Sequence, residues 1–147
     1  MLAREELAVF LGEAGGEGGG GPRAELRGPA VTIAATAVQP LAMAIHELAT
    51  NATKYGALSR PEGVLTLEWE VLAEPPERLR LVWRERGGPP VAAPPSERGF
   101  GTRVLQATLV RQLGGTLALH WDPAGLRCEV VLPAARALVR VEAAALA

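Results

Sequence analysis

A long amphipathic helix, predicted from about Thr36 or Ala37 to Tyr55, constrains the fold of this chain more than any other feature. Pro40 falls within its predicted first turn, where the missing N–H does little harm, and Gly56 is the predicted stop. The apolar side chains of this helix follow the helical repeat and require another layer to pack against: Leu41, Ile45, Leu48, Ala49 and Ala52.

The polar face of the same helix carries an unusual set of groups. Glu47, Asn51 and Lys54 are spaced by four and then three residues, so their side chains lie above one another. A carboxylate can act as a base, a carboxamide oxygen can bind a hard cation, and an ammonium group can contact a phosphate. The set suggests metal-assisted nucleotide chemistry, although an ordinary solvated helix face explains it equally well.

The rest of the chain supplies the second layer as short strands. Apolar and polar residues alternate in several segments separated by Gly- or Pro-containing turns. These segments are Glu25–Gly28, Val31–Ile33, Gly63–Leu72, Leu79–Glu85, Thr116–Trp121 and Leu126–Leu132. A second helix is predicted from Gly99–Thr102 to about Leu113, before Gly114 and Gly115. The order predicts an α/β fold, a two-layer sandwich with helices on one face of a mixed, mostly antiparallel sheet.

Length and composition exclude several functional classes. A chain of 147 residues is one domain by its length, and its net charge of −1 without a basic stripe argues against nucleic-acid binding. Cys128 is the single cysteine, so neither an internal disulfide nor a cysteine metal cluster is possible. No apolar run reaches the roughly 20 residues of a membrane span, and residues 1–10 lack a secretory apolar stretch. We therefore expect a cytoplasmic protein without direct membrane insertion.

Glycine-rich segments divide the chain and suggest phosphate contacts. Residues 1–24 read as the end of a preceding helical region and a linker, residues 25–133 as the domain, and residues 134–147 as an Ala-rich, helical tail. The glycine run Gly12–Pro22 lacks the Gly-Lys-Ser/Thr ending of a P-loop. Arg86–Arg98 is a predicted lid or binding loop, and Gly99-Phe100-Gly101 opens a helix whose N-terminus is suited to an anion.

Two motifs carry a resemblance to a known family. The first is His46-Glu47-Leu48-Ala49-Thr50-Asn51-Ala52-Thr53-Lys54-Tyr55-Gly56-Ala57-Leu58-Ser59, and the second is Trp83-Arg84-Glu85, followed by Gly-Gly-Pro-Pro-Val and later Gly-Phe-Gly-Thr. Together they resemble the ATP-binding catalytic domain of bacterial sensor histidine kinases, and more narrowly the HWE subfamily. This domain has the Bergerat-type ATP-binding fold shared with gyrase, a heat-shock chaperone and the MutL repair ATPase. The resemblance covers roughly residues 25–133.

The resemblance implies a role for each site residue. Asn51 is the expected Mg²⁺ ligand, Glu47 the acid that orients or deprotonates the acceptor, and Lys54 the group that neutralises phosphate charge. Tyr55 is expected to wall the nucleoside. Glu85 stands where many relatives use Asp to accept a hydrogen bond from the adenine amino group. The remaining expected contacts are Gly87 and Gly88 near the base, and Gly99, Gly101 and Thr102 at the phosphates. ATP and Mg²⁺ are thus the expected cofactors. His46 and Trp83 are expected to be structural.

The resemblance also implies partners that this sequence does not contain. A histidine kinase of this type transfers the γ-phosphoryl group to a histidine on a dimerisation domain and from there to a response regulator. No histidine precedes Glu25, so the chain is expected to be a fragment or a trimmed domain that does not phosphorylate itself on the usual histidine. A non-catalytic, partner-binding module of the same fold is an alternative. An anti-sigma-type serine kinase is another, which the Trp-x-Glu motif disfavours.

Overall fold

The protein is built on one five-stranded sheet, in the order β1-β2-β3-β5-β4. The computed structural model describes residues 23–90 and 102–139. Most of the predicted linker, most of the predicted lid loop and most of the predicted tail lie outside these ranges. The linker was predicted to extend to residue 24, but residues 23 and 24 already belong to the first strand. The strands are β1 (Arg23–Arg27), β2 (Val64–Leu72), β3 (Arg78–Arg86), β4 (Thr116–Asp122) and β5 (Gly125–Pro133).

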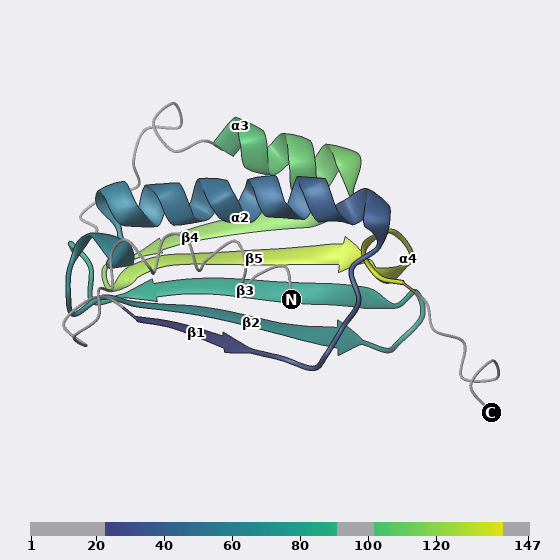
Figure 1. Ribbon diagram of the computed structural model, residues 1–147, viewed down its shortest axis with the longest axis horizontal. Coiled ribbons are helices and arrows are strands. Elements are labelled where there is room, and N and C mark those ends of the chain that lie inside the picture. Colours follow the sequence, from purple (N-terminus) through teal and green to yellow (C-terminus); the bar gives the residue numbers. More distant parts are fainter. Residues whose placement is uncertain (1–22, 91–101, 140–147) are drawn as a thin grey trace.

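Strand pairing confirms the predicted mixed, mostly antiparallel sheet. β2 pairs antiparallel with β3, β3 with β5, and β5 with β4, whereas β1 runs parallel to β2. The predicted second strand, Val31–Ile33, is wrong: Ile33 forms only an isolated bridge with Leu138. This segment serves as the connection that leads the chain from the edge strand β1 up to the helix layer (Figure 1).

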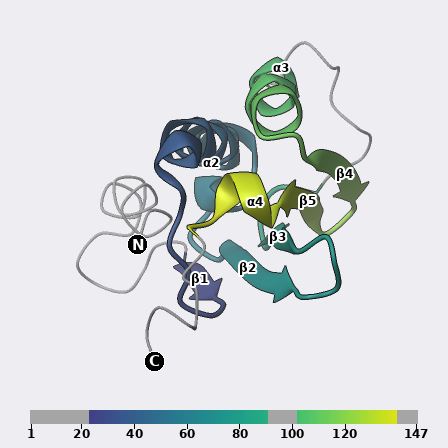
Figure 2. The same cartoon turned by 90° about the vertical axis from the view of Figure 1, so that its right-hand side faces the viewer.

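Two helical segments cover one face of the sheet, as Figures 1 and 2 show. The long helix α2 spans Ala35–Tyr55 and is followed by a short 3-10 turn, η1 (Ala57–Ser59). The second segment begins as α3 (Thr102–Leu105) and continues as a π-helical stretch, η3 (Gln106–Gln112). Gly114, with a φ of 71°, follows its end. The predicted helical tail is one turn within the described residues, α4 (Ala134–Ala137).

The core lies between the helices and the inward face of the sheet. As predicted, Leu41, Leu48, Ala49 and Ala52 of α2 are buried, and Ile45 is partly buried. Pro40 lies deeper in the helix than predicted, because α2 already begins at Ala35. The sheet contributes alternate residues, as strand geometry requires. They are Leu65, Leu67 and Trp69 of β2, Leu79 and Trp83 of β3, and Leu126, Cys128, Val130 and Leu132 of β5.

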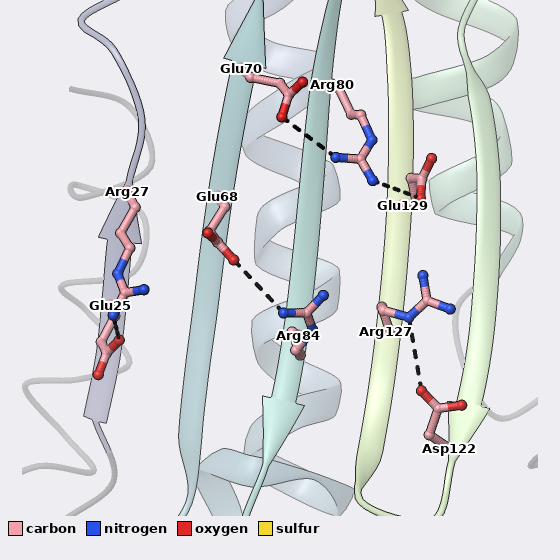
Figure 3. A network of polar contacts seen from close by, with 9 residues as sticks. All are labelled: Glu25, Arg27, Glu68, Glu70, Arg80, Arg84, Asp122, Arg127 and Glu129. Atoms are coloured by element: carbon pink, nitrogen blue, oxygen red, sulfur yellow. Dashed lines mark hydrogen bonds and ion pairs between the residues drawn. The ribbon is translucent and has the colours of Figure 1, made fainter.

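The opposite face of the sheet carries charged side chains instead of helices (Figure 3). Arg80 lies between Glu70 and Glu129, at 3.6 and 3.2 Å, and Arg84 faces Glu68 at 3.9 Å. These ion pairs join neighbouring strands across the exposed side. Within the described ranges, no helix has both the length and the apolar character needed to cross a membrane.

Candidate nucleotide site

Two of the predicted site segments, the end of α2 and the residues at the end of β3, lie at the same end of the molecule (Figure 1). Glu85 is the next-to-last residue of β3, and Gly87 and Gly88 are the first two residues after this strand. α2 ends at Tyr55, and η1 begins two residues later. The structure thus brings together segments that lie about thirty residues apart in the sequence.

Glu85 is the buried acid of this site. Glu85 follows Trp83 on the inward face of β3. Although it is an acid, it is only 5% exposed. Two donors hold its carboxylate from different elements. The Trp83 indole N–H donates to Oε2 at 2.9 Å, and the Ala57 backbone N–H donates to Oε1 at 3.0 Å. The carboxylate therefore links the end of β3 to the segment that follows α2.

Burial sets the protonation behaviour of Glu85. Removal from water raises the pKa of the Glu85 carboxyl, and the hydrogen bonds from Trp83 and Ala57 partly oppose that rise. The nearest thiol responds in the same direction. Burial, with a smaller contribution from the charge of Glu85, raises the pKa of Cys128 to about 12, so this cysteine is a neutral core residue.

Glycines allow the backbone to pack tightly around Glu85. A Cβ on Gly56 would collide with the Glu85 carboxylate, and one on Gly88 would approach the backbone of Gly56 and Ala57 within 2.7–2.8 Å. Gly56 has a φ of −118°, which any residue adopts, so space rather than conformation requires glycine there. Gly87 differs, because its φ of 76° lies in the left-handed region that glycine favours.

The polar face of α2 passes from the protein interior to solvent. Asn51 is buried, with 8% of its surface exposed, Glu47 is half-buried, and Lys54 is exposed. A purely solvated face, the simpler interpretation of this pattern, therefore does not hold for Asn51. Lys54 lies in the last turn of α2, where a cation offsets the negative end of the helix dipole. Tyr55, the last residue of α2, is 64% exposed.

The second glycine motif precedes the second helical segment. Gly99 and Gly101 lie outside the described residues, and Thr102 is the first residue of α3. In Figure 1, α3 begins toward the end of the molecule at which α2 stops.

An apolar cavity of about 460 Å³ lies elsewhere, between α2 and the sheet. Its lining includes Leu41, Ile45, Trp69 and Trp83 but neither Asn51 nor Glu85. Because such a lining offers almost no hydrogen-bond partner, this cavity does not suit a phosphate or a nucleotide base.

Sequence reasoning missed two contributors to the site. It assigned Trp83 to packing alone and gave Ala57 no role, yet both donate to Glu85. The contact between Trp83 and Glu85 could have been predicted from their spacing, since residues i and i+2 of a strand share a face. No sequence signal indicated the second, because a backbone N–H is present at almost every position.

No family model matches the chain. A blue-light-activated histidine kinase of Brucella anthropi is 38% identical over 114 residues, and one of Brucella ovis is 35% identical over 112 residues. These matches cover 77% and 76% of this chain but only 23% of each relative. The chain thus spans about a quarter of the length of the curated relatives it matches.

Solved structures share the fold. The histidine kinase domain of the Erythrobacter litoralis blue-light activated histidine kinase superposes with a TM-score of 0.69 at 18% identity, covering 91% of this chain and 62% of that one. The catalytic domain of histidine kinase ThkA gives 0.65 at 14% identity, covering 90% and 89%. The chain is a homologue of histidine kinases and has the fold of their catalytic domain. Full-length ShkA, solved in complex with AMPPNP, gives 0.66 at 18% identity and covers 96% of this chain and 30% of that one.

Proposed function

We propose that this chain is the ATP-binding catalytic domain of an HWE-type sensor histidine kinase and works with Mg²⁺ in the cytoplasm. It would transfer the γ-phosphoryl group of ATP to a histidine on a dimerisation domain, for onward transfer to a response regulator. The observation that carries the proposal is the buried Glu85 carboxylate beside the C-terminal end of α2, in a fold shared with histidine kinase catalytic domains.

The residues present fit an adenine nucleotide. A carboxylate only accepts hydrogen bonds, and the exocyclic amino group of adenine donates them, so Glu85 is complementary to adenine and not to the guanine carbonyl at the equivalent ring position. The close packing of Gly88 on Gly56 leaves no side chain between these backbones. We assign the base to Glu85, Gly87 and Gly88, with the exposed Tyr55 ring beside the nucleoside.

The same residues can hold the phosphates and the metal. Mg²⁺ prefers hard oxygen ligands and retains several waters, so the carboxamide oxygen of Asn51 together with phosphate oxygens suffices to hold it. Bound there, Mg²⁺ would neutralise charge on the transferring phosphoryl group. Lys54 would contribute a further positive charge from the last turn of α2, with Gly99, Gly101 and Thr102 supplying phosphate contacts. Glu47, one helical turn before Asn51, would orient or deprotonate the acceptor histidine.

Titration calorimetry with Mg-ATP tests the binding step. We expect the wild-type domain to bind Mg-ATP in the micromolar to millimolar range, and Asn51→Ala to weaken binding at least about tenfold by removing a metal ligand. Gln39→Ala is the matched control, since it removes an exposed carboxamide near the other end of the same helix. A folded wild-type domain that binds no nucleotide would contradict the proposal.

A transfer assay tests the reaction. The chain is mixed with a separate histidine-bearing helical acceptor domain and ATP labelled at the γ-phosphate. An acid-labile, base-stable label on the acceptor supports histidine transfer. An acid-stable label would indicate a serine kinase, and association without transfer would indicate a regulatory module.

A further inference from the structure

The indole N–H of Trp83 is buried next to the acid assigned to adenine. Trp83 is 2% exposed and lies two residues before Glu85 on β3, on the same inward face. Its Nε1 donates to Glu85 Oε2 at 2.9 Å. The other carboxylate oxygen, Oε1, accepts from Ala57 at 3.0 Å. Among the residues that the structure describes, each oxygen of Glu85 therefore has one donor.

This arrangement fixes the orientation of the carboxylate without saturating it. A carboxylate oxygen has two lone-pair sites, so one site on each oxygen is left for a further donor. Glutamate has one more rotatable bond than aspartate, and ordering that bond on ligand binding costs conformational entropy. Two donors that already hold the carboxylate reduce this cost before the nucleotide arrives.

We propose that Trp83 is a positioning residue for adenine recognition, whose ring N–H holds Glu85 in the orientation that accepts the adenine amino group. The inference rests on the proposed function, because it concerns the same adenine site. It assigns to the tryptophan of the Trp-x-Glu motif a role beyond packing: the tryptophan supplies the hydrogen bond that the longer acid needs.

The sharpest test removes the hydrogen-bond donor of Trp83 and changes little else. Trp83 is replaced with 3-benzothienylalanine, in which sulfur takes the place of the ring N–H while the bicyclic shape is kept. This choice avoids the cavity that a smaller residue would leave at a fully buried site. A version with 7-azatryptophan at the same position retains the N–H and serves as the rescue.

Trp69 provides a matched control on the neighbouring strand. It also faces the helix layer, and its Nε1 donates to the Pro29 carbonyl at 2.7 Å, away from Glu85. Placing 3-benzothienylalanine at position 69 therefore removes an indole hydrogen bond of similar length. Thermal unfolding of both proteins checks that each remains folded.

Calorimetry then separates positioning from packing. We expect the change at position 83 to weaken ATP binding about tenfold and to reduce the ratio of ATP to GTP affinity by a similar factor, as expected for a hydrogen bond to a charged group. The change at position 69 should leave the ATP/GTP ratio unchanged, and 7-azatryptophan at position 83 should restore it. An unchanged ratio at position 83 would overturn the inference while leaving the proposed function intact, whereas a wild-type chain that binds no ATP would overturn both.

A second readout needs no nucleotide. Carbon NMR of a ¹³C-labelled Glu85 carboxyl follows the titration of this group. The neighbouring ionisable group is the buried thiol of Cys128, whose pKa is raised in part by the charge of Glu85. Loss of the Trp83 N–H removes a contact that stabilises the charged form, so the pKa of Glu85 should move upward. A titration identical to that of the wild-type protein would overturn the inference.

Discussion

Gly56 lies directly against the buried carboxylate of Glu85, so a methyl group at position 56 would occupy the place of Oε1. Gly56, the residue directly after α2, and the acid of β3 therefore share one small volume. Oε1 also accepts the hydrogen bond from Ala57, the next residue after Gly56. Any side chain at position 56 must displace Glu85 or the turn that holds it.

The first prediction concerns Gly56→Ala. We expect it to destabilise the domain by about 1–3 kcal/mol, as overpacking of a close-packed site does, and to weaken ATP binding because Glu85 moves. Urea unfolding and calorimetry measure the two effects. The control is the double variant with Glu85→Ala, in which the methyl group has space. Similar destabilisation by Gly56→Ala in both backgrounds would contradict a direct clash, since groups in contact are not additive.

The second prediction concerns the pH dependence of stability. Because burial raises the pKa of Glu85 above its value in the unfolded chain, the contribution of Glu85 to stability is greatest below the unfolded pKa and declines as pH rises through the folded one. The Glu85→Gln variant has no ionisable group at position 85 and keeps all other ionisable groups of the wild-type protein. The free energy of unfolding of wild type minus that of Glu85→Gln should therefore fall with rising pH across that interval. Urea unfolding at a series of pH values measures it, and a difference that rises or stays constant would contradict the burial argument.

Most of the fold followed from periodicity. Alternation placed the β2–β3 and β4–β5 hairpins within a residue or two of their observed ends, because one face of each strand packs on the core and the other meets solvent. The same reasoning failed for Val31–Ile33, where three residues alternate but only Ile33 forms a bridge. A segment that short carries too little pattern to separate a strand from a connection that lies across the layers.

The site was only partly predictable. Helical spacing grouped Glu47, Asn51 and Lys54, but it could not show that Asn51 is buried, because burial depends on what the sheet brings beside the helix. The hydrogen bond from Ala57 to Glu85 joins residues 28 positions apart. Only the tertiary fold creates that pair, so no local pattern in the sequence marks it.

A third prediction concerns the ion pairs on the open face of the sheet (Figure 3). Arg80 is 35% exposed and contacts both Glu70 and Glu129, so solvent screens much of the attraction. We expect Arg80→Ala to lower the free energy of unfolding by less than about 1 kcal/mol at neutral pH, and by less still in 1 M salt. Arg78→Ala, an exposed arginine of the same strand, is the control.

Acidification should also weaken the effect of Arg80→Ala. The hydrogen bond from Arg80 lowers the pKa of Glu129 below its unfolded value, so this contribution is present above the unfolded pKa and is lost as pH falls through the folded one. Urea unfolding at neutral and acidic pH measures the change. A larger effect of Arg80→Ala in acid would contradict the pairing with Glu129.

The last prediction uses Lys54, the single lysine of the chain, as a reporter of the phosphates. Its exposed amine lies in the last turn of α2, after the buried Asn51. An ATP acyl phosphate carries its acyl group at the terminal phosphate and transfers it to a nearby amine, releasing ATP. If Lys54 contacts the phosphates, this probe should acylate Lys54, and excess Mg-ATP should prevent the reaction. Peptide mass spectrometry identifies the modified residue. In Asn51→Ala, labelling by the probe should fall while a general amine-reactive ester still modifies Lys54, since the amine stays exposed. Labelling that Mg-ATP does not suppress, or that occurs only at the N-terminal amine, would remove Lys54 from the phosphate site and leave charge neutralisation to the metal.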